Sequence, residues 1–588
     1  MTFAAEWRRE EMREKLRNYY EAYCESIREE AERLRPKQMP QPTEELFAIF
    51  ENTGNRLTYE AVYFQRRKFL AIFGLKTILD GEEQDIAKLE EVLEEICGEE
   101  CWALPAHVNR EKDRDWRIYV DLFAAETGQT LAEILSLLEG KISERVAGMI
   151  RREVRRRVLD PFCRSKAPYG IWEYNRSNWC AVCGGSVGSA AIYLMQEEPE
   201  RLGTVLKRIC YSLQQYYLEG FAEDGTCLEG LGYFTYGMTY FAGFAEQLYR
   251  FTEGKADLFQ GEKLARIAAF QAKCYFDSGR TVSFADGFCA DTFRTGLTCY
   301  LAMRYPEAGI PPMECAAGIN DDTCYRWMGL YRNLIWTKQY LELWGAESAP
   351  DAAAYPQMGI CVLPDAQWVI CHSRNGAGMA AKGGNNGEPH NHNDVGSFFY
   401  LNGEDVLLTD LGCGEYTGDY FSDRRYGYLC CRSLGHNVPL VDGGEQLSGE
   451  AYGCDLFEAG EEGRIVIGFA GAYGNPALQS LTRRLDWNQE DGTLQVEDVF
   501  TLSRELQSLR ENLVTVWKPE IQDNEIRIQG EKKGCLITIQ GKPAEIACIR
   551  QDFSDHDGIR RDVWLLQWEV YLPGESGTGS ACFSVKAL

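Results

Sequence analysis

The sequence predicts a helical N-terminal domain followed by a domain of antiparallel β-sandwich sheets. Up to about residue 345 the apolar residues recur at three- and four-residue spacing, whereas beyond residue 358 they alternate in short runs separated by turn residues. The chain of 588 residues is also longer than one hydrophobic core usually supports. We therefore expect a helical domain over 1–345, a linker over 346–358 and a β-sandwich domain over 359–588.

The helical part contains amphipathic runs long enough to form helix hairpins. Thr130 and Glu133 form a capping-box pattern ahead of Leu131 and Ile134, which predicts that a helix begins there. Stacked hairpins of this kind build a bundle, a solenoid or a closed toroid, and the periodicity does not distinguish the three. The expected helices cover 82–97, 130–158, 187–197, 202–219, 236–251 and 263–276.

The composition changes after Trp344. The next fifteen residues, GAESAPDAAAYPQMG, are rich in alanine and proline and show no periodicity, which is typical of a linker. The short alternating runs that follow predict strands with one face buried. The expected strands cover 360–371, 397–401, 406–408, 464–468, 493–500, 525–529, 536–540 and 563–571.

Charge and composition exclude several classes of partner. The net charge of −27 disfavours nucleic acids and anionic membranes, which are usually bound by basic surfaces. The N-terminus is charged throughout and lacks the apolar centre of a signal peptide, so the 22 cysteines are expected to be reduced and the protein cytoplasmic. If a leader has been removed, the address would instead be secreted or periplasmic. The oligomeric state stays open, with a homo-oligomer among the alternatives.

Three of the six histidines fall in the window from Lys382 to Gly443. If the segment is extended, His390, His392 and Asp394 point to one side, because strand side chains alternate. Two imidazoles beside a carboxylate suit either a metal site or acid/base chemistry.

Two later residues extend this pattern. A short strand over 406–408 follows the Asn402-Gly403 turn signal and delivers Asp410 at its end, and His436 follows after a loop. Histidine, aspartate and histidine from three segments would form a metal shell, with zinc as the expected occupant. The alternative is that these histidines are hydrogen-bonded polar residues of a β core.

The motifs HNHNDVGSF, LTDLG and GHNVPLVDG together resemble the heparinase II/III-like family of polysaccharide lyases. The resemblance implies an N-terminal (α/α) toroid followed by antiparallel β-sandwich sheets. It also implies cleavage of uronate-containing polysaccharides by β-elimination, so an acidic polysaccharide or oligosaccharide becomes the expected substrate.

In that family pattern the first histidine is catalytic and the second binds metal. The resemblance therefore makes His390 catalytic and assigns His392, Asp410 and His436 to a structural divalent metal, expected to be zinc. Asp394 would orient an imidazole. The expected sources of positive charge for an acidic substrate are Arg424, Arg425 and Arg432.

The NW…GG…AA pattern resembles the family segment whose asparagine contacts the uronate carboxylate. Asn178 fits this role, with Asn175 as the fallback and Trp179 as a further substrate contact. The family's catalytic tyrosine lies in a Gly/Tyr-rich segment. Tyr240 or Tyr236 is the expected acid, and Tyr233 is the third choice. The three are spaced for one helix face, which is also how a core stripe would look.

Either that tyrosine or His390 would act as the base. Two other functions stay open. A glycoside hydrolase on the same scaffold needs two carboxylates flanking the scissile bond, for which Glu229, Asp224 and Glu388 are candidates. Glu229 is also an expected substrate contact in the lyase. A non-catalytic carbohydrate-binding protein would use the aromatic loops alone.

Overall fold

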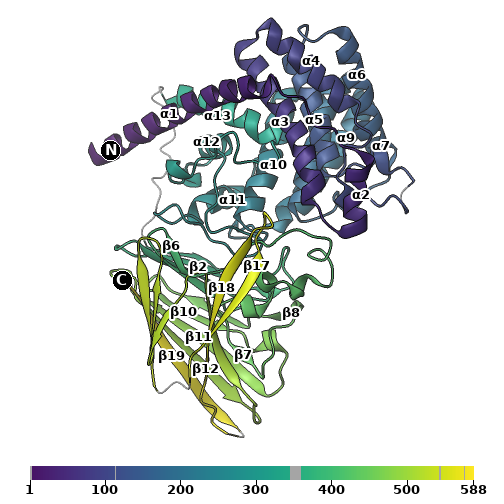
Figure 1. Cartoon of the computed structure of the whole chain (residues 1–588). Helices are drawn as coiled ribbons and strands as arrows, with labels where there is room; N and C mark the ends of the chain where they lie inside the picture. Colours follow the sequence, from purple (N-terminus) through teal and green to yellow (C-terminus); the bar gives the residue numbers. More distant parts are fainter. Residues whose placement is uncertain (1–2, 113, 345–358, 542–544, 575) are drawn as a thin grey trace. The chain divides into compact units, whose positions relative to one another are not determined.

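The computed structural model describes residues 3–112, 114–344, 359–541, 545–574 and 576–588 (Figure 1). The predicted linker over 346–358 lies outside the described residues. The chain forms two compact units. The helical unit comprises Met1–Phe221, Tyr233–Ala268 and Thr292–Ala354; the β unit comprises Ala222–Gly232, Ala269–Asp291 and Tyr355–Leu588.

The helical unit is a toroid of antiparallel helix hairpins. Several helices that are neighbours in the sequence pack together, such as α3 with α4, α8 with α9 and α12 with α13, and α13 also packs against α1 and α3. Small residues of α8 allow a close approach to α10: a Cβ on Gly188 would lie 2.4 Å from the ring of Phe244. The helices are α1 (Phe3–Leu34), α2 (Glu44–Thr53), α3 (Leu57–Asp80), α4 (Glu83–Cys97), α5 (Leu122–Leu137), α6 (Glu144–Val154), α7 (Asp160–Arg164), α8 (Asn178–Leu194), α9 (Pro199–Ser212), α10 (Leu231–Phe251), α11 (Glu262–Lys273), α12 (Thr295–Arg304) and α13 (Trp327–Trp344).

The predicted helix over 130–158 is wrong in its start and its continuity. Helix α5 begins after Asp121, whose side chain accepts a hydrogen bond from the third helical residue's N–H at 2.7 Å. Thr130 lies inside the helix and donates to the Glu126 carbonyl at 2.7 Å. Glu133 is buried, and its carboxylate forms an ion pair with Arg332 of α13 at 2.6 Å. The carboxylate therefore binds a residue of another helix and does not cap the start of its own helix.

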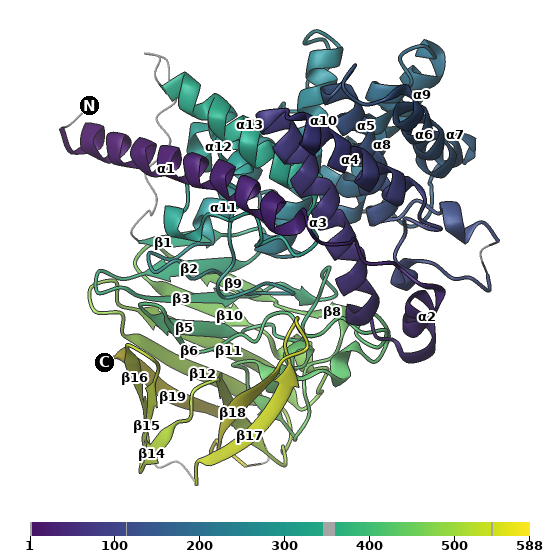
Figure 2. The same ribbon diagram turned by 45° about the horizontal axis from the view of Figure 1, so that its top comes forward.

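The β unit is built from antiparallel sheets (Figure 2). One sheet has the order β1-β2-β3-β5-β6, another β14-β15-β16-β19-β12-β11-β10-β9, a third β17-β18-β13-β7, and β4 pairs with β8. Strand β12 alternates buried and more exposed residues, as one-sided burial requires. The strands are β1 (Ile360–Leu363), β2 (Trp368–His372), β3 (Ala377–Lys382), β4 (Asn385–Asn386), β5 (Phe398–Asn402), β6 (Asp405–Leu408), β7 (Leu440–Val441), β8 (Gly449–Gly453), β9 (Leu456–Ala459), β10 (Arg464–Gly468), β11 (Leu478–Trp487), β12 (Leu494–Leu502), β13 (Leu509–Thr515), β14 (Glu520–Gln522), β15 (Glu525–Gln529), β16 (Gly534–Ile539), β17 (Ala547–Ser554), β18 (Arg560–Glu569) and β19 (Gly577–Ala587).

Most expected strands are confirmed to within three residues at each end. The exception is 360–371, which forms the hairpin of β1 and β2 rather than one strand. Pro364 follows β1 directly, and Gln367 adopts the left-handed backbone region with φ 57°. A proline cannot donate to a sheet ladder, so the chain turns here.

Two segments from the helical part of the sequence, 222–232 and 269–291, belong to the β unit. Aromatic contacts tie the second to the first sheet: the ring centroid of Phe276 lies 5.8 Å from that of Phe399, and that of Phe284 lies 5.1 Å from that of Trp368. A single boundary near residue 345 therefore does not separate the two units along the sequence.

Two smaller expectations can be compared with the structure. All 22 cysteines lie in the described residues, where none is paired in a disulfide. Among the described residues, no helix combines the length and apolar character that crossing a bilayer requires.

Candidate active site and metal centre

The histidine motif lies in a loop between β4 and β5 rather than in an extended strand, so the predicted one-face arrangement is wrong. His390 adopts the left-handed backbone region with φ 56°, a conformation that costs a non-glycine residue about 1–2 kcal/mol. The loop is tied to a neighbouring segment by the Asn393 N–H, which donates to the Cys431 carbonyl at 3.0 Å, and by Ser433 Oγ, which donates to the Asn393 carbonyl at 2.7 Å.

Both histidines of the motif meet on one carboxylate, that of Asp286. His390 Nδ1 lies 2.6 Å from Asp286 Oδ2, and His392 Nε2 lies 3.1 Å from Oδ1. The Tyr420 hydroxyl donates to Oδ1 at 2.5 Å and the Tyr416 hydroxyl to Oδ2 at 3.1 Å. Arg425 Nη2 also donates to Oδ1, at 2.9 Å. All these residues belong to the β unit.

Asp286 is fully buried and remains a carboxylate. Burial by itself raises the pKa of the Asp286 carboxyl, but hydrogen bonds from His390 and His392 outweigh burial and hold that pKa well below its usual range. The sequence analysis missed Asp286 because it lies in the run SFADGF, far from the histidine motif, and no local spacing links the two.

The structure brings the three predicted metal ligands together. One ligand atom from each of His392, Asp410 and His436 lies within 4.8 Å of the others, and all three residues are buried. His436 Nε2 donates to the Cys430 carbonyl at 2.9 Å, and His392 Nε2 donates to Asp286. In both rings Nδ1 is therefore the nitrogen that could bind a metal.

These residues fit a divalent metal. His392 Nδ1 is buried without a hydrogen-bond partner among the described residues, and His436 Nδ1 lies 3.1 Å from Asp410 Oδ2. Two imidazole nitrogens and a carboxylate oxygen form a donor set common at zinc. Asp394 does not orient an imidazole, contrary to the prediction: it pairs with Lys382 Nζ at 2.8 Å, because that buried ammonium needs a counter-charge.

The three acidic candidates each have another partner. Glu229 Oε2 lies 3.5 Å from His390 Nε2, so the sequence-distant Glu229 faces the catalytic candidate. Asp224 accepts the backbone N–H groups of residues 365 and 366 at 2.8 and 3.0 Å and holds a turn. Glu388 lies 3.7 Å from Lys382 Nζ.

The three predicted arginines are each opposed by a carboxylate. Arg425 is bound to Asp286, Arg424 pairs with Asp419, and Arg432 Nε donates to Glu445 at 2.9 Å. Their role toward an acidic substrate stays a prediction. Arg425 is the member of the set that lies at the histidine cluster.

In the helical unit, the tyrosines of α10 share a face as their spacing predicts. The Tyr236 hydroxyl donates to Glu126, and the guanidinium of Arg326 lies 4.1 Å from the centroid of the Tyr236 ring. Tyr240 is 1% exposed, and its hydroxyl has no hydrogen-bond partner among the described residues. Burial, reinforced by the charge of Glu126, raises the pKa of both phenols well above the usual range. Tyr233 is half-buried.

The asparagine segment lies at the start of α8. Asn178 is the first helical residue and is 1% exposed. Asn175 accepts the backbone N–H of Ser177 at 2.9 Å, which shapes the turn before the helix. The Trp179 ring packs edge-on against His107 with centroids 4.8 Å apart. The structure thus places all three on the helical unit, with Asn178 buried.

Glu126 gives the helical unit a pH-dependent stability. Burial raises its pKa to about 7, against the opposing charge of Arg326. The folded state therefore keeps a proton that the unfolded chain loses above about pH 4.3, so stability should fall as the pH rises from about 5 to 7. The total loss is about 4 kcal/mol at 1.36 kcal/mol per pKa unit. We expect Glu126→Gln to flatten this slope in urea unfolding at pH 5 and 8; equal slopes in both proteins would contradict it.

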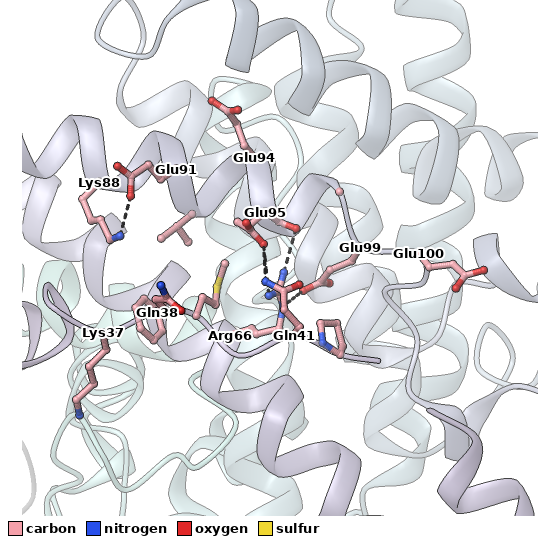
Figure 3. Close-up of a pocket in the computed structure, with 15 residues that line it drawn as sticks. Lys37, Gln38, Gln41, Arg66, Lys88, Glu91, Glu94, Glu95, Glu99 and Glu100 are labelled. Carbon is pink, nitrogen blue, oxygen red and sulfur yellow. Dashed lines mark hydrogen bonds and ion pairs between the residues drawn. The ribbon is translucent and has the colours of Figure 1, made fainter. Parts of the chain in front are cut away.

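A cavity of about 780 Å³ opens elsewhere on the helical unit, beside α3 and α4 (Figure 3). Two pairs of its charged side chains bind each other: Arg66 Nε donates to Glu99 at 2.6 Å, and Lys88 Nζ donates to Glu91 at 2.7 Å. None of the predicted site residues lines it, so the chemistry of the sequence motifs and this cavity do not coincide.

No protein-family model matches the chain, and no curated protein matches it. Solved structures do. Heparinase III is 12% identical over 98% of this chain and 92% of its own, with a TM-score of 0.61. Heparan sulfate lyase HepC from Pedobacter heparinus is 12% identical over 97% of this chain and 88% of its own, at a TM-score of 0.58. Chondroitin AC lyase from Streptomyces coelicolor A3, in complex with chondroitin sulphate, is 12% identical over 96% of this chain and 79% of its own, with a TM-score of 0.55.

These likenesses confirm the predicted fold. The chain has the heparinase-like polysaccharide lyase fold, a helical toroid followed by antiparallel β-sheets. At 12% identity these similarities establish the fold alone, so the reaction has to be inferred from the residues of the site.

Proposed function

We propose that this protein is a polysaccharide lyase that cleaves uronic-acid-containing polysaccharides or oligosaccharides by β-elimination, leaving 4,5-unsaturated uronate ends. The observation that carries the proposal is the pairing of His390 with the buried carboxylate of Asp286 beside a metal-ligand triad, in a fold shared with glycosaminoglycan lyases. An imidazole held by a carboxylate is equipped to move a proton at its other nitrogen.

The chemistry makes three demands. The proton at C5 of the uronate lies α to a carboxylate, so the charge of that carboxylate must be neutralised before an enolate-like intermediate can form. A base then removes the C5 proton, and an acid protonates the departing O4. We assign His390 either to the carboxylate or to the C5 proton. Asn178, the first choice for the carboxylate, is only 1% exposed, so the half-buried Asn175 is assigned to that role. A tyrosine of α10 is the acid and, where His390 binds the carboxylate, also the base.

A divalent metal, which we take to be zinc, would be held by His392, Asp410 and His436. It would supply a fixed charge that joins the histidine loop to the segments after β6 and before β7, a structural contribution. The protein's own residues then do the chemistry. The net charge of −27 opposes an acidic substrate, and Arg425 at the histidine cluster is the expected local counter-charge.

The activity test is incubation with heparan sulfate, chondroitin sulfate, hyaluronan, alginate and their oligosaccharides, monitored by the ultraviolet absorbance of the unsaturated uronate. Absorbance with one of them supports the lyase and names its substrate. Reducing ends that accumulate without this absorbance would instead indicate a glycoside hydrolase, and binding without cleavage would indicate a carbohydrate-binding protein.

Burial separates the three tyrosine candidates. An acid must reach the substrate oxygen, and Tyr240 is enclosed in the helical core, whereas Tyr233 and Tyr236 are half-buried. We expect Tyr233→Phe or Tyr236→Phe to lower kcat by about 10²–10⁴-fold, and Tyr240→Phe by less than about tenfold. Steady-state kinetics of the three variants decide this. The matched change is the loss of one hydroxyl in each case, so a comparable loss in Tyr240→Phe would overturn the ranking.

A further inference from the structure

One buried carboxylate joins the catalytic candidate to a metal ligand. Asp286 Oδ2 lies 2.6 Å from His390 Nδ1, and Oδ1 of the same group lies 3.1 Å from His392 Nε2. Each oxygen therefore serves a different imidazole. Asp286 reaches both from segment 269–291, more than a hundred residues before them in the sequence.

The two contacts fix what each ring can offer. A ring nitrogen that donates its proton to a carboxylate leaves the other nitrogen as the working atom. For His390 the working atom is then Nε2, which faces Glu229 at 3.5 Å. For His392 it is Nδ1, the buried atom without a hydrogen-bond partner that belongs to the proposed metal site.

The carboxylate is itself held in place. Tyr420, Tyr416 and Arg425 donate to its oxygens at 2.5, 3.1 and 2.9 Å. Arg425 Nε also donates to the Asn391 carbonyl at 2.9 Å, between the two histidines in the sequence. These donors compensate for burying the charge and leave Asp286 little freedom to rotate.

We propose that Asp286 is a positioning residue that couples the metal centre to His390 by orienting both imidazoles at once. The role at His390 rests on the proposed lyase function, whereas the role at His392 does not. A change at Asp286 therefore alters metal affinity and turnover together, although Asp286 is not among the three grouped ligands.

The test uses Asp286→Asn in the full chain. An amide keeps one acceptor oxygen but replaces the other with an NH₂ group, so its two ends cannot both accept a hydrogen bond from an imidazole N–H. We expect about 10–100-fold weaker cobalt(II) affinity, measured by chelator competition and by the visible absorption of bound cobalt. We also expect about 10–100-fold lower kcat, with a smaller change in KM.

Asp405→Asn is the matched control. Asp405 is also a buried aspartate of the β unit, but it accepts the backbone N–H groups of residues 531–533, at 3.2, 2.8 and 2.7 Å. Its cobalt affinity and kcat should stay at the wild-type level. Wild-type cobalt affinity and kcat in folded Asp286→Asn would overturn the proposal, as would equal losses in Asp405→Asn.

The coupling by Asp286 can still be tested if the Asp286→Asn variant does not fold or if the protein is not a lyase. If Asp286→Asn does not fold, Asp286→Glu decides: it keeps the charge, displaces the oxygens by one methylene, and should still weaken cobalt binding. If no polymer yields unsaturated product with the wild-type protein, the lyase function fails, and the cobalt measurement still tests the coupling. Loss of turnover with unchanged cobalt affinity would reject the coupling and keep the lyase.

Discussion

Replacing His390 with alanine is expected to lower kcat for β-elimination by about 10²–10⁴-fold, the usual contribution of a positioned proton-transfer group. His390 Nδ1 lies 2.6 Å from Asp286 Oδ2, and Nε2 on the other side of the ring faces Glu229 at 3.5 Å. The loss should appear mainly in kcat, because the group acts on the transition state. Initial rates of unsaturated uronate formation measure it.

His390→Asn distinguishes the two roles left open for His390. An asparagine can donate a hydrogen bond to the uronate carboxylate but cannot remove a proton from carbon. Substantial rescue relative to His390→Ala would indicate that His390 neutralises the carboxylate and that a tyrosine is the base. Circular dichroism verifies that both variants fold. Near-wild-type kcat in folded His390→Ala would contradict any catalytic role.

Removing the divalent metal is expected to lower the melting temperature of the β unit by about 10 °C. A ligand at a thousand times its dissociation constant stabilises the folded state by about 4 kcal/mol, and each kcal/mol shifts a domain of this size by about 2–4 °C. The effect should be confined to the β unit, since all three ligands belong to it. Differential scanning calorimetry with and without chelator measures it.

His436→Gln should abolish this response to chelator, since it removes one of three protein ligands. The matched control is His372→Gln. His372 is a buried histidine of β2 that packs against Phe276 with ring centroids 5.0 Å apart and is not among the grouped ligands. Chelator should still destabilise this control. If wild-type and His436→Gln proteins melt alike with and without chelator, the metal site is excluded.

The grouping of His392, Asp410 and His436, the three predicted metal ligands, was predictable because its signals are local. The short strand over 406–408 ends just before Asp410, and the turn at Asn402-Gly403 fixes where that strand begins, with Gly403 at φ 60°. Hydrophobic alternation and turn residues act over a few positions, so they can be recognised in the sequence. The clustering of His392 and His436 then supplied the remaining ligands.

The tyrosines of α10 show that a local sequence pattern predicts which residues share a helix face but not how they are buried. Spacing predicted that Tyr236 and Tyr240 share a face of α10, and their ring centroids lie 5.7 Å apart. The same spacing did not show that Tyr240 is enclosed or that Tyr236 donates to Glu126 of α5. These properties depend on which helix packs opposite, and that partner is distant in the sequence.

The sequence by itself determined the helix-then-sheet architecture and most of the strands, because periodicity and turn chemistry operate within a few residues. It also predicted the grouping of His392, Asp410 and His436. Only the tertiary structure decided that Asp286 accepts hydrogen bonds from both His390 and His392. Asp286 lies in a segment that the sequence assigned to the helical domain. The physical reason is that a buried carboxylate is recognised by the donors folded around it, and those donors come from positions over a hundred residues away.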